Sequence, residues 1–541
     1  MADSEAFTAH VDTYCRDHLP PHDQWPRLEF TLPELDYPDR LNCATVLLDD
    51  TIAKFGADRP CLTSGDETWT YGDLRRHANQ IAHVLTEDLG LIPGGRVLLR
   101  GFNNLWMAAC WFGALKAGGV VVATMPLLRA HEIRALIERT RSGIVLCDRR
   151  LDEEMIPATE GVTAAYFGGD TPDDLIALAA TKPADFDDVL TAADDVALLA
   201  PTSGTTGVPK ATMQFHRDVL AVCDTFSKYV LKPTKDDVFT GTPPIGFTFG
   251  LGGLLLFPLR AGASAVLMER GTQDAITDAI ENKGTTILFT APTGYRAMVR
   301  TGRAAILGKL RRAVSAGEHL PGAVWQEIHD HTGLSVIDGI GSTEMMHVFI
   351  SASDDDIRPG ATGRAVPGYR ARVVDNDGHE VPNGQVGRLA VIGPTGCRYL
   401  DDPRQRDYVE NGWNITGDTY IHDDDGYFWY QARNDDMIIS SGYNIAAPSV
   451  EQALLQHPDV LECAVIGIPN EERGQLVHAV VVLRDGVSGD DAKRVELQNF
   501  VKNSIAPYQY PRSLEFRTEL PKSATGKLQR YKLRQDTGIQ Q

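Results

Sequence analysis

Apolar runs alternate with segments of helical period from about residue 40 to about residue 430. The apolar runs are rich in β-branched residues and include "GRVLLRG", "GGVVVAT", "SGIVLCD", "VALLAP" and "TTILFTAP". "GDLRRHANQIAHVLTEDLG" shows the spacing of an amphipathic helix. Continuous apolar strands separated by helices are typical of βαβ units whose parallel sheet is buried on both faces. The pattern therefore predicts an α/β fold with βαβ-type sheets and flanking helices.

The pattern shortens after the segment "YQARNDDMIISSGYN". "SVEQALLQHPDVLECAVIGIP" and "LVHAVVVLRDG" then predict helix, strand and strand, on the scale of a small domain of about 100 residues. A chain of 541 residues is also too long for one hydrophobic core. We expect a large N-terminal domain over residues 1–433 and a small α+β domain over residues 434–541.

Composition narrows the class of protein. With 43% hydrophobic and 23% charged residues, the chain is typical of a globular protein. Its net charge of -21 disfavours long-range attraction to nucleic acid or to an anionic membrane. The eight cysteines show no CxxC pair or metal-ligand spacing, which indicates reduced thiols. Since "MADSEAFTAHVDTYCRDH" lacks the order of a signal peptide, we expect a cytoplasmic protein. The sequence leaves the oligomeric state, monomer or homodimer, open.

The segment "TSGTTGVPK" follows a predicted strand and concentrates hydroxyls, glycines and one lysine. Glycines 204 and 207 permit close backbone approach, and hydroxyls with exposed N–H groups can surround phosphate oxygens. The spacing is not GxxxxGK[ST], which excludes the P-loop NTPase pattern. A polar surface loop is the alternative, but it accounts neither for the preceding strand nor for the closing "PK". The phosphate-binding residues we predict are Thr202, Ser203, Gly204, Thr205, Thr206, Gly207 and Lys210.

Four further motifs follow in a fixed order. They are "DGIGSTEMMH" at 338–347, "TGD" at 416–418, "ARNDDMI" at 432–438 and "PKSATGKLQR" at 521–530. Together with "TSGTTGVPK", this series resembles the adenylate-forming (AMP-binding) acyl and aryl CoA ligase superfamily. The resemblance covers nearly the whole chain and implies a large domain with a mobile lid, and ATP, Mg²⁺ and CoA as cofactor and co-substrates.

The resemblance also implies roles for single residues around the nucleotide. Thr343 would contact the α-phosphate, and Glu344 would ligate Mg²⁺, which prefers hard oxygen ligands. Asp418 and Arg433 would bind the ribose. Adenine recognition maps to Gly317 and Glu318 in "SAGEHL" and to the backbone around Asp338, Gly339 and Ile340.

One active site of this kind performs two reactions, which is the reason for a mobile lid. The acid first attacks the α-phosphate of ATP to give an acyl-AMP and pyrophosphate, and a thiol then takes the acyl group. The resemblance assigns Lys527 to the first step, where it would stabilise developing charge. It places the hinge at Asp435 and lines the CoA tunnel with Ser441 and Gly442, although "IISSG" stands where many members carry a Gly-Gly pair.

The segment "PPIGFTFGLGG" at 243–253 resembles the acyl pocket of the same family. Together with "DGIGSTEMMH" it is most similar to benzoate and 2-aminobenzoate CoA ligases. Two Phe rings form a flat apolar slot that suits an aromatic ring, although such side chains are more often plain core. The predicted pocket residues are Phe247, Thr248, Phe249, Gly341, Met346 and His347, next to Ile340.

Polar atoms of Thr248 and His347 in an apolar slot favour an acid with a polar ring substituent, since an unpaired buried polar group costs about 1–3 kcal/mol. We therefore expect 2-aminobenzoate or 2-hydroxybenzoate (salicylate) in preference to benzoate. Two alternatives stay open. The enzyme could load a carrier protein instead of CoA, although no carrier domain is recognisable in the sequence. It could also be a non-catalytic nucleotide-binding regulator, against which the presence of both Lys527 and Glu344 argues.

Overall fold

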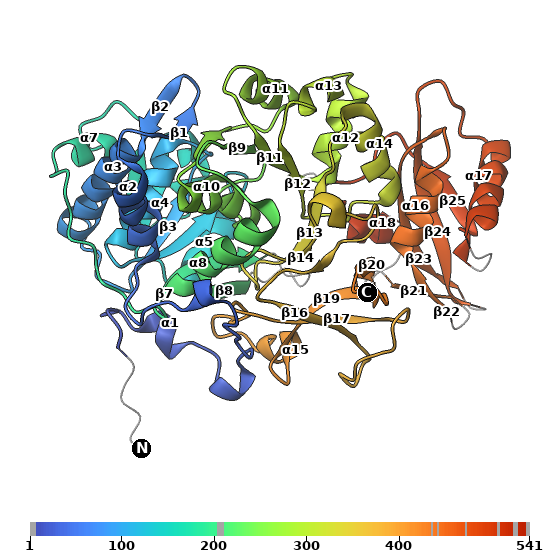
Figure 1. The fold of residues 1–541 in the computed structure, drawn as a ribbon, viewed down its shortest axis with the longest axis horizontal. Coiled ribbons are helices and arrows are strands. Elements are labelled where there is room, and N and C mark those ends of the chain that lie inside the picture. The colour runs from blue at the N-terminus through green and yellow to red at the C-terminus, as the bar shows by residue number, and fades with distance from the viewer. Residues whose placement is uncertain are drawn as a thin grey trace.

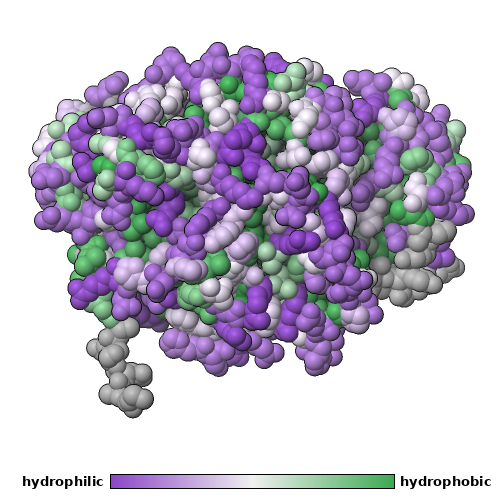
Figure 2. All heavy atoms as spheres, in the orientation of Figure 1, coloured by the Kyte–Doolittle hydropathy of each residue, from purple (hydrophilic) through white to green (hydrophobic). Residues whose placement is uncertain are grey.

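The computed structural model describes residues 7–202, 210–433, 437–440, 443–470, 473–505, 509–522 and 528–536. Residues up to 433 form a large body of sheets and helices, and the residues from 437 onward form a smaller body beside it (Figure 1). Most side chains on the face drawn in Figure 2 are hydrophilic. Among the described helices, none combines the length and the apolar composition that crossing a bilayer requires.

The first sheet has the strand order β6-β5-β3-β4-β7-β8. Its neighbours pair in parallel, except for the antiparallel pair of β7 and β8. The apolar runs predicted as buried strands include β3, β4, β5 and β7, so the α/β reading is confirmed here. The strands are β3 (Arg96–Arg100), β4 (Val120–Thr124), β5 (Ile144–Asp148), β6 (Thr163–Phe167), β7 (Val196–Thr202) and β8 (Lys210–Phe215).

The second sheet has the order β15-β14-β13-β12-β11-β9-β10-β1-β2. Its interior pairs are parallel, while β2, β14 and β15 add antiparallel edges. The strands are β1 (Pro60–Ser64), β2 (Glu67–Thr70), β9 (Val238–Gly241), β10 (Ser264–Leu267), β11 (Ile287–Thr290), β12 (Arg312–Ser315), β13 (Ile337–Gly341), β14 (Val348–Ser351) and β15 (Arg364–Ala365).

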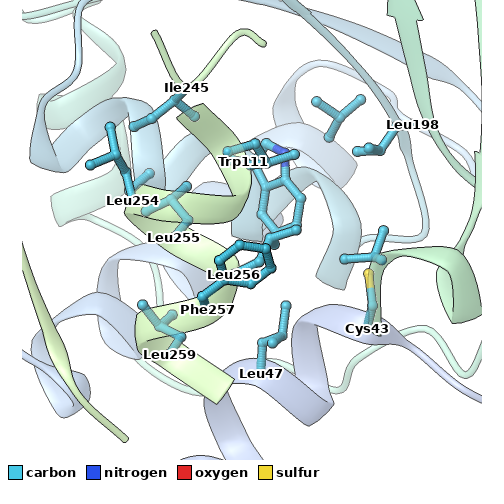
Figure 3. Close-up of a cluster of buried hydrophobic side chains, with 14 of the residues drawn as sticks. Cys43, Leu47, Trp111, Leu198, Ile245, Leu254, Leu255, Leu256, Phe257 and Leu259 are labelled. Atoms are coloured by element: carbon cyan, nitrogen blue, oxygen red, sulfur yellow. The ribbon is translucent and has the colours of Figure 1, made fainter. Parts of the chain in front are cut away.

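Helix α4 (Leu105–Lys116) lies between these two sheets and contacts β3, β4 and β1. It is buried along almost its whole length, as expected of a helix that is apolar on every side. Its neighbour α3 (Tyr71–His83) begins with a capping box, in which the Thr70 hydroxyl accepts from the backbone N–H of Asp73. Figure 3 shows Trp111 of α4 among leucines of the helical segment that runs from Thr248 to Ala261.

Further helices surround the two sheets of the large body (Figure 1). They are α1 (Tyr14–Asp17), α2 (Asp50–Phe55), α5 (Ala130–Thr140), α6 (Asp152–Met155), α7 (Leu175–Ala180), α8 (His216–Val222), α9 (Thr248–Leu251), α10 (Phe257–Ala261), α11 (Gln273–Glu281), α12 (Pro292–Arg300), α13 (Ala304–Leu307), α14 (Gly322–Thr332) and α15 (Gln405–Tyr408). A π-helical turn, η7 (Gly252–Leu256), joins α9 to α10 without a break.

A third, antiparallel sheet closes the large body, with the order β16-β17-β19-β18 and β20 paired to β19. The long strand β19 carries the "TGD" motif into the middle of the molecule, below β13 and β14 (Figure 1). The strands are β16 (Arg370–Val374), β17 (Val386–Ile392), β18 (Val409–Glu410), β19 (Trp413–His422) and β20 (Phe428–Arg433).

The smaller body has its own sheet, of order β22-β21-β24-β23 with β25 paired to β24. The domain boundary that we place at 433/434 stays a prediction, because residues 434–436 lie outside the described ranges. Strand β20, which precedes the boundary, pairs with β19 of the large body, and β21, which follows it, pairs with β22 and β24 of the smaller body. The elements are β21 (Met437–Ser440), β22 (Tyr443–Ala446), α16 (Ala447–Leu455), β23 (Val460–Asn470), β24 (Gly474–Leu483), α17 (Asp491–Ser504), β25 (Ser513–Phe516) and α18 (Arg530–Asp536).

Candidate active site

The predicted phosphate loop connects two hydrogen-bonded strands. Thr202 at the end of β7 faces Lys210 at the start of β8 in the antiparallel register, so both ends of the loop are fixed by the same sheet. The Lys210 side chain is half-buried at this edge. The other residues predicted for phosphate binding, Ser203, Gly204, Thr205, Thr206 and Gly207, lie outside the described residues, and their role stays a prediction.

Strand β8 also holds the segment that contains Glu344. The buried Gln214 of β8 donates from Nε2 to the backbone oxygens of Thr343 (3.0 Å) and Glu344 (3.2 Å). Lys210, Thr212 and Gln214 stand two residues apart, and alternate positions of a strand point to the same face. The sequence analysis missed Gln214, although this alternation of polar and apolar residues in "KATMQF" was the available signal.

Tyr399 connects the two predicted phosphate-binding groups. Its hydroxyl donates to Oε1 of Glu344 at 2.6 Å and accepts from Nζ of Lys210 at 3.3 Å. Burial, and after it the charge of Glu344, raise the pKa of Tyr399 far above its ordinary value, so the phenol stays protonated and donates. The sequence analysis missed Tyr399, because no spacing rule links it to Glu344 at a separation of 55 residues.

The donor set around Glu344 fits a divalent cation. Oε2 of Glu344 accepts no hydrogen bond within the described part of the chain, and the half-buried Thr343 stands beside it. Mg²⁺ binds such hard carboxylate oxygens and shares them with phosphates. The assignment of the cation to Glu344 therefore stays a prediction that the geometry permits.

The predicted ribose residues occupy neighbouring strands. Asp418 of β19 and Arg433 of β20 are direct partners in the antiparallel register. Between them and the predicted adenine residue Asp338 lies the buried Tyr420. Burial first, and then the Asp418 carboxylate, raise the pKa of Tyr420, and Asp338 contributes in the same direction. Asp418 and Asp338 therefore approach the same tyrosine from different strands.

Asp338 itself brings a buried polar atom to this region. Its Oδ1 has no hydrogen-bond partner within the described residues, and burial raises the pKa of its carboxyl group. Gly339, the next residue, leaves no room for a side chain, because a Cβ there would stand 2.7 Å from Cγ1 of Val348. The residues to which the sequence analysis assigns adenine thus lie in the segment after β12 and within β13, and their role stays a prediction.

The "SAGEHL" segment meets the third sheet. Gly317 has a φ of +87°, a left-handed conformation that favours glycine, and Glu318 beside it is half-buried. His319 stacks on Tyr430 of β20 with ring centroids 4.9 Å apart. Burial and the nearby charge of Arg530 lower the pKa of His319 to about 4, which places the start of α18 near the predicted adenine motif.

The motifs that are far apart in the sequence converge around Tyr408. Burial raises the pKa of Tyr408, and the carboxylates of Glu344 and Asp418 both act in the same direction. Its hydroxyl forms a 3.0 Å hydrogen bond with Oγ of Ser342, two residues before Glu344. The predicted phosphate, metal and ribose groups therefore share one region of the large body.

The predicted acyl pocket contains an aromatic cage around His347. The imidazole lies 4.6 Å from Phe257, 5.3 Å from Phe226 and 5.8 Å from Phe249, between ring centroids. His347 is 97% buried, with a relative exposure of 3%. Neither ring nitrogen makes a well-aligned hydrogen bond within the described residues, and burial lowers the pKa of His347 to about 3 against a smaller opposing contribution from the backbone of Phe249.

The helical segment around η7 sets the shape of this cage. A Cβ at Gly252 would stand 2.5 Å from Cδ2 of His347 and 2.9 Å from Phe257, so only glycine fits there. Phe249 also packs against Phe289 of β11, at 5.4 Å between centroids. Phe226, Phe257 and Phe289 were missed by the sequence analysis, because they come from three separate elements.

The other predicted pocket residues have defined places in the fold. Phe247 and Thr248 stand at the first turn of α9 and are half-buried, while Met346 is fully buried and has a left-handed φ of +68°. A Cβ at Gly341 would stand 2.7 Å from the backbone oxygen of His347. Whether Phe247, Thr248, Gly341 and Met346 touch the acid stays a prediction.

The smaller body contacts the large one beside this site. Arg296 of α12 donates to the backbone oxygen of Leu461 at 2.7 Å, and Arg300 pairs with Glu462 at 3.4 Å. Glu462 also pairs with Lys522 at 2.7 Å, just before the predicted lysine loop. Lys527, Asp435, Ser441 and Gly442 lie outside the described residues, so their roles as catalytic lysine, hinge and tunnel stay predictions.

Comparisons with known proteins identify the family and relatives of this chain. The family described as AMP-binding enzyme matches residues 48–398, and the family described as AMP-binding enzyme C-terminal domain matches residues 449–527. A benzoate–CoA ligase of Thauera aromatica is 34% identical over 516 residues, which are 93% of this chain and 98% of that protein.

Two solved structures show the same fold. An anthranilate CoA ligase in complex with anthranoyl-AMP superposes with a TM-score of 0.88 and 32% identity, covering 93% of this chain and 99% of that one. A benzoate CoA ligase from Burkholderia xenovorans gives a TM-score of 0.84 and 31% identity, covering 91% and 100% of the two chains. The expected fold, a large N-terminal domain and a small C-terminal one, is confirmed by these neighbours.

Proposed function

This chain belongs to the AMP-binding enzyme family and is an AMP-forming acid–thiol ligase, and we propose that it is an aryl-CoA ligase that activates an ortho-substituted benzoate. The carboxylate of the acid attacks the α-phosphate of ATP, which gives an aryl-AMP and releases pyrophosphate. The thiol of CoA then attacks the mixed anhydride, which gives the thioester and releases AMP. The relatives support the coarser part of this proposal, since their names include benzoate and anthranilate CoA ligases.

The large body's own residues give the first step its electrostatics. Lys210 brings an ammonium group to the end of the phosphate loop, where it attracts phosphate oxygens. Glu344 offers the carboxylate oxygen Oε2, and Tyr399 holds the other oxygen at 2.6 Å. Mg²⁺, when bound there, would neutralise charge on the phosphates. Preorganised charges of this kind act mainly on the transition state, where the charge develops.

The observation that carries the choice of acid is the aromatic cage around His347. Three Phe rings around one imidazole form an apolar environment that suits a flat ring. The two unpaired nitrogens of His347 offer hydrogen bonds to a polar substituent, and leaving them unpaired costs about 1–3 kcal/mol. We therefore favour 2-aminobenzoate or 2-hydroxybenzoate over benzoate.

The thiol that accepts the acyl group distinguishes this proposal from its alternative, in which the enzyme loads a carrier protein. Both routes share the first step, so pyrophosphate release alone does not separate them. The purified protein should release pyrophosphate when an aromatic acid and ATP are added, and should form AMP and a thioester when free CoA follows. Pyrophosphate release without consumption of CoA would favour a carrier protein, and no acid-dependent release at all would indicate a non-catalytic nucleotide-binding protein.

The small domain is proposed to serve the two steps in turn. In this proposal Lys527 acts only in adenylation, and rotation about Asp435 exchanges its loop for the segment of Ser441 and Gly442. Lys527→Ala should slow pyrophosphate release by about 10²–10³, the usual loss for an electrostatic contact made in the transition state. Thioester formation from supplied aryl-AMP should stay within about twofold of the wild-type rate. Equal losses of rate in both steps would contradict the proposed exchange of the two segments in the active site.

A further inference from the structure

The predicted phosphate-binding groups are joined by a side chain that lies outside the motifs named in the sequence analysis. Tyr399 lies at the end of the segment "GPTGCRY", far from both partners in the sequence. Its hydroxyl donates to Oε1 of Glu344 at 2.6 Å and accepts from Nζ of Lys210 at 3.3 Å. The ammonium also lies 4.7 Å from the centre of the phenol ring, within the range of a cation–π contact.

The backbone around Tyr399 is bonded to β8 and to Gln405. Its backbone N–H donates to Oε1 of Gln405 at 2.9 Å, and Thr212 of β8 forms a β-bridge with it. The two residues that flank Tyr399 in the chain also bond to β8. The backbone N–H of Met213 donates to the backbone oxygen of Arg398 at 2.7 Å, and the backbone N–H of Leu400 donates to the backbone oxygen of Ala211 at 2.9 Å. The side chain itself is fully buried. The phenol oxygen is therefore fixed by the same strand that carries Lys210.

We propose that Tyr399 is a positioning residue, which holds the Glu344 carboxylate and the Lys210 ammonium in place for ATP and its cation. One carboxylate oxygen is occupied by the phenol, which leaves Oε2 as the free ligand atom. A carboxylate held in one rotamer loses less conformational entropy when it binds a ligand. The inference rests on the proposed function, because it assigns Glu344 and Lys210 to the phosphate end of the site.

The first variant for the test is Tyr399→Phe, which removes only the hydroxyl. Tyr71→Phe is the matched control, because Tyr71 is equally buried and its hydroxyl donates to the backbone oxygen of Ala263 at 2.6 Å instead of to a predicted ligand group. Both variants lose one buried hydroxyl, so a loss of stability alone should affect them alike. Thermal unfolding of each variant provides this baseline.

The kinetic readout separates positioning from general damage. Tyr399→Phe should raise the Mg²⁺ concentration for half-maximal pyrophosphate release by about tenfold, the loss expected for one hydrogen bond to a charged group. Thioester formation from supplied aryl-AMP and CoA should change by less than about twofold. Tyr71→Phe should leave the Mg²⁺ dependence within about twofold of wild type.

A binding readout needs no acid and no turnover. Mn²⁺ binding to the protein with ATP, followed by electron paramagnetic resonance, should weaken by about tenfold in Tyr399→Phe and stay unchanged in Tyr71→Phe. If wild type converted no aromatic acid, the proposed function would fail while this measurement still decided the role of Tyr399. Unchanged Mn²⁺ binding in Tyr399→Phe, equal losses in both variants, or equal losses in both half-reactions would overturn the inference.

Discussion

The two ends of the candidate site treat their buried polar groups in opposite ways. At the phosphate end, Tyr399 is bonded to both Lys210 and Glu344. At the ring end, His347 is as deeply buried, but both of its nitrogens are unpaired within the described residues. A satisfied network is rigid and preorganised, while an unpaired buried group costs about 1–3 kcal/mol until something pairs with it.

This difference indicates a division of tasks within one site. In the proposed function, the phosphate end carries the chemistry that every acid needs, and its Lys210, Tyr399 and Glu344 side chains are already paired with one another. The ring end would decide which acid is used, because a suitable substituent would pair with His347. Changes at the phosphate end should therefore affect all acids equally, and changes at the ring end should affect them differently.

The strongest test of the phosphate end is Glu344→Gln, which keeps the shape and removes the charge. Pyrophosphate release should fall by about 10²–10³ for every acid, because the lost charge acts in the transition state. Single-turnover measurements with ATP and a panel of acids check this factor. Thioester formation from supplied aryl-AMP is the internal control. If the loss of pyrophosphate release differed from one acid to another, the proposed separation of the two ends of the site would be wrong.

Gly252→Ala tests the packing of the ring end. The added Cβ would stand 2.5 Å from His347 and 2.9 Å from Phe257, and such overpacking typically costs about 1–3 kcal/mol. kcat/KM for the aromatic acid should fall, while KM for ATP stays within about twofold of wild type. Gly143→Ala is the matched control, since a Cβ at Gly143 meets no atom within 4 Å. If KM for ATP rose by the same factor by which kcat/KM for the acid fell, the two ends of the site would not act independently, and the proposed division of tasks would be wrong.

The burial of His347 should also appear in the pH dependence of stability. Its pKa is lowered from 6.5 to about 3, so below pH 6.5 the unfolded chain takes up a proton that the folded chain does not. Stability is thus unaffected by this group above pH 6.5 and falls as the pH drops from 6.5 toward 3. Between pH 7 and pH 5 this loss amounts to about 2 kcal/mol.

His347→Gln, which cannot be protonated, should recover that loss. Denaturant midpoints at pH 7 and pH 5 measure it, with His379→Gln as the control, because the His379 side chain is 80% exposed. If wild type and His347→Gln lost the same stability between the two pH values, the imidazole would be solvated and the description of the cage would be wrong.

His347→Ala should have the smallest effect, on selectivity. All aromatic acids lose packing against the imidazole, but only a substituted ring loses a hydrogen bond worth about 0.5–1.5 kcal/mol. Relative to benzoate, kcat/KM for 2-aminobenzoate or 2-hydroxybenzoate should therefore fall by a further few-fold to tenfold, about the factor that such a bond provides. An equal factor for all three acids would make His347 a packing residue and remove the basis for an ortho substituent.

The predicted phosphate end is easier to recognise in the sequence than the ring end, for a physical reason. The groups predicted to bind phosphate come from short contiguous motifs, such as "TSGTTGVPK" and "GSTEMMH", whose residue types are dictated by chemistry. The α/β architecture follows from apolar runs that strands β3, β4, β5 and β7 confirm. Tyr399 was missed even there, because its contact with Glu344 depends on the pairing of a distant segment with β8.

The ring end depends on tertiary packing, which periodicity does not reveal. His347 and Phe249 were predicted together, and the structure brings their rings to 5.8 Å. Phe226, Phe257 and Phe289 complete the cage from elements that no motif connects, and an aromatic residue in a helix is usually core. The left-handed conformation of Met346, at a φ of +68°, was equally unpredictable, since a buried methionine rarely adopts it.

The most direct test of the account is the substrate profile of the wild-type enzyme. kcat/KM for CoA thioester formation should be measured with benzoate, 2-aminobenzoate, 2-hydroxybenzoate, cyclohexanecarboxylate and hexanoate at saturating ATP. The account predicts that the aromatic acids exceed the two saturated acids by at least about tenfold, and that an ortho-substituted acid is the best of them by a few-fold. Equal or greater kcat/KM for hexanoate or cyclohexanecarboxylate would contradict the claim that the cage around His347 selects an aromatic ring.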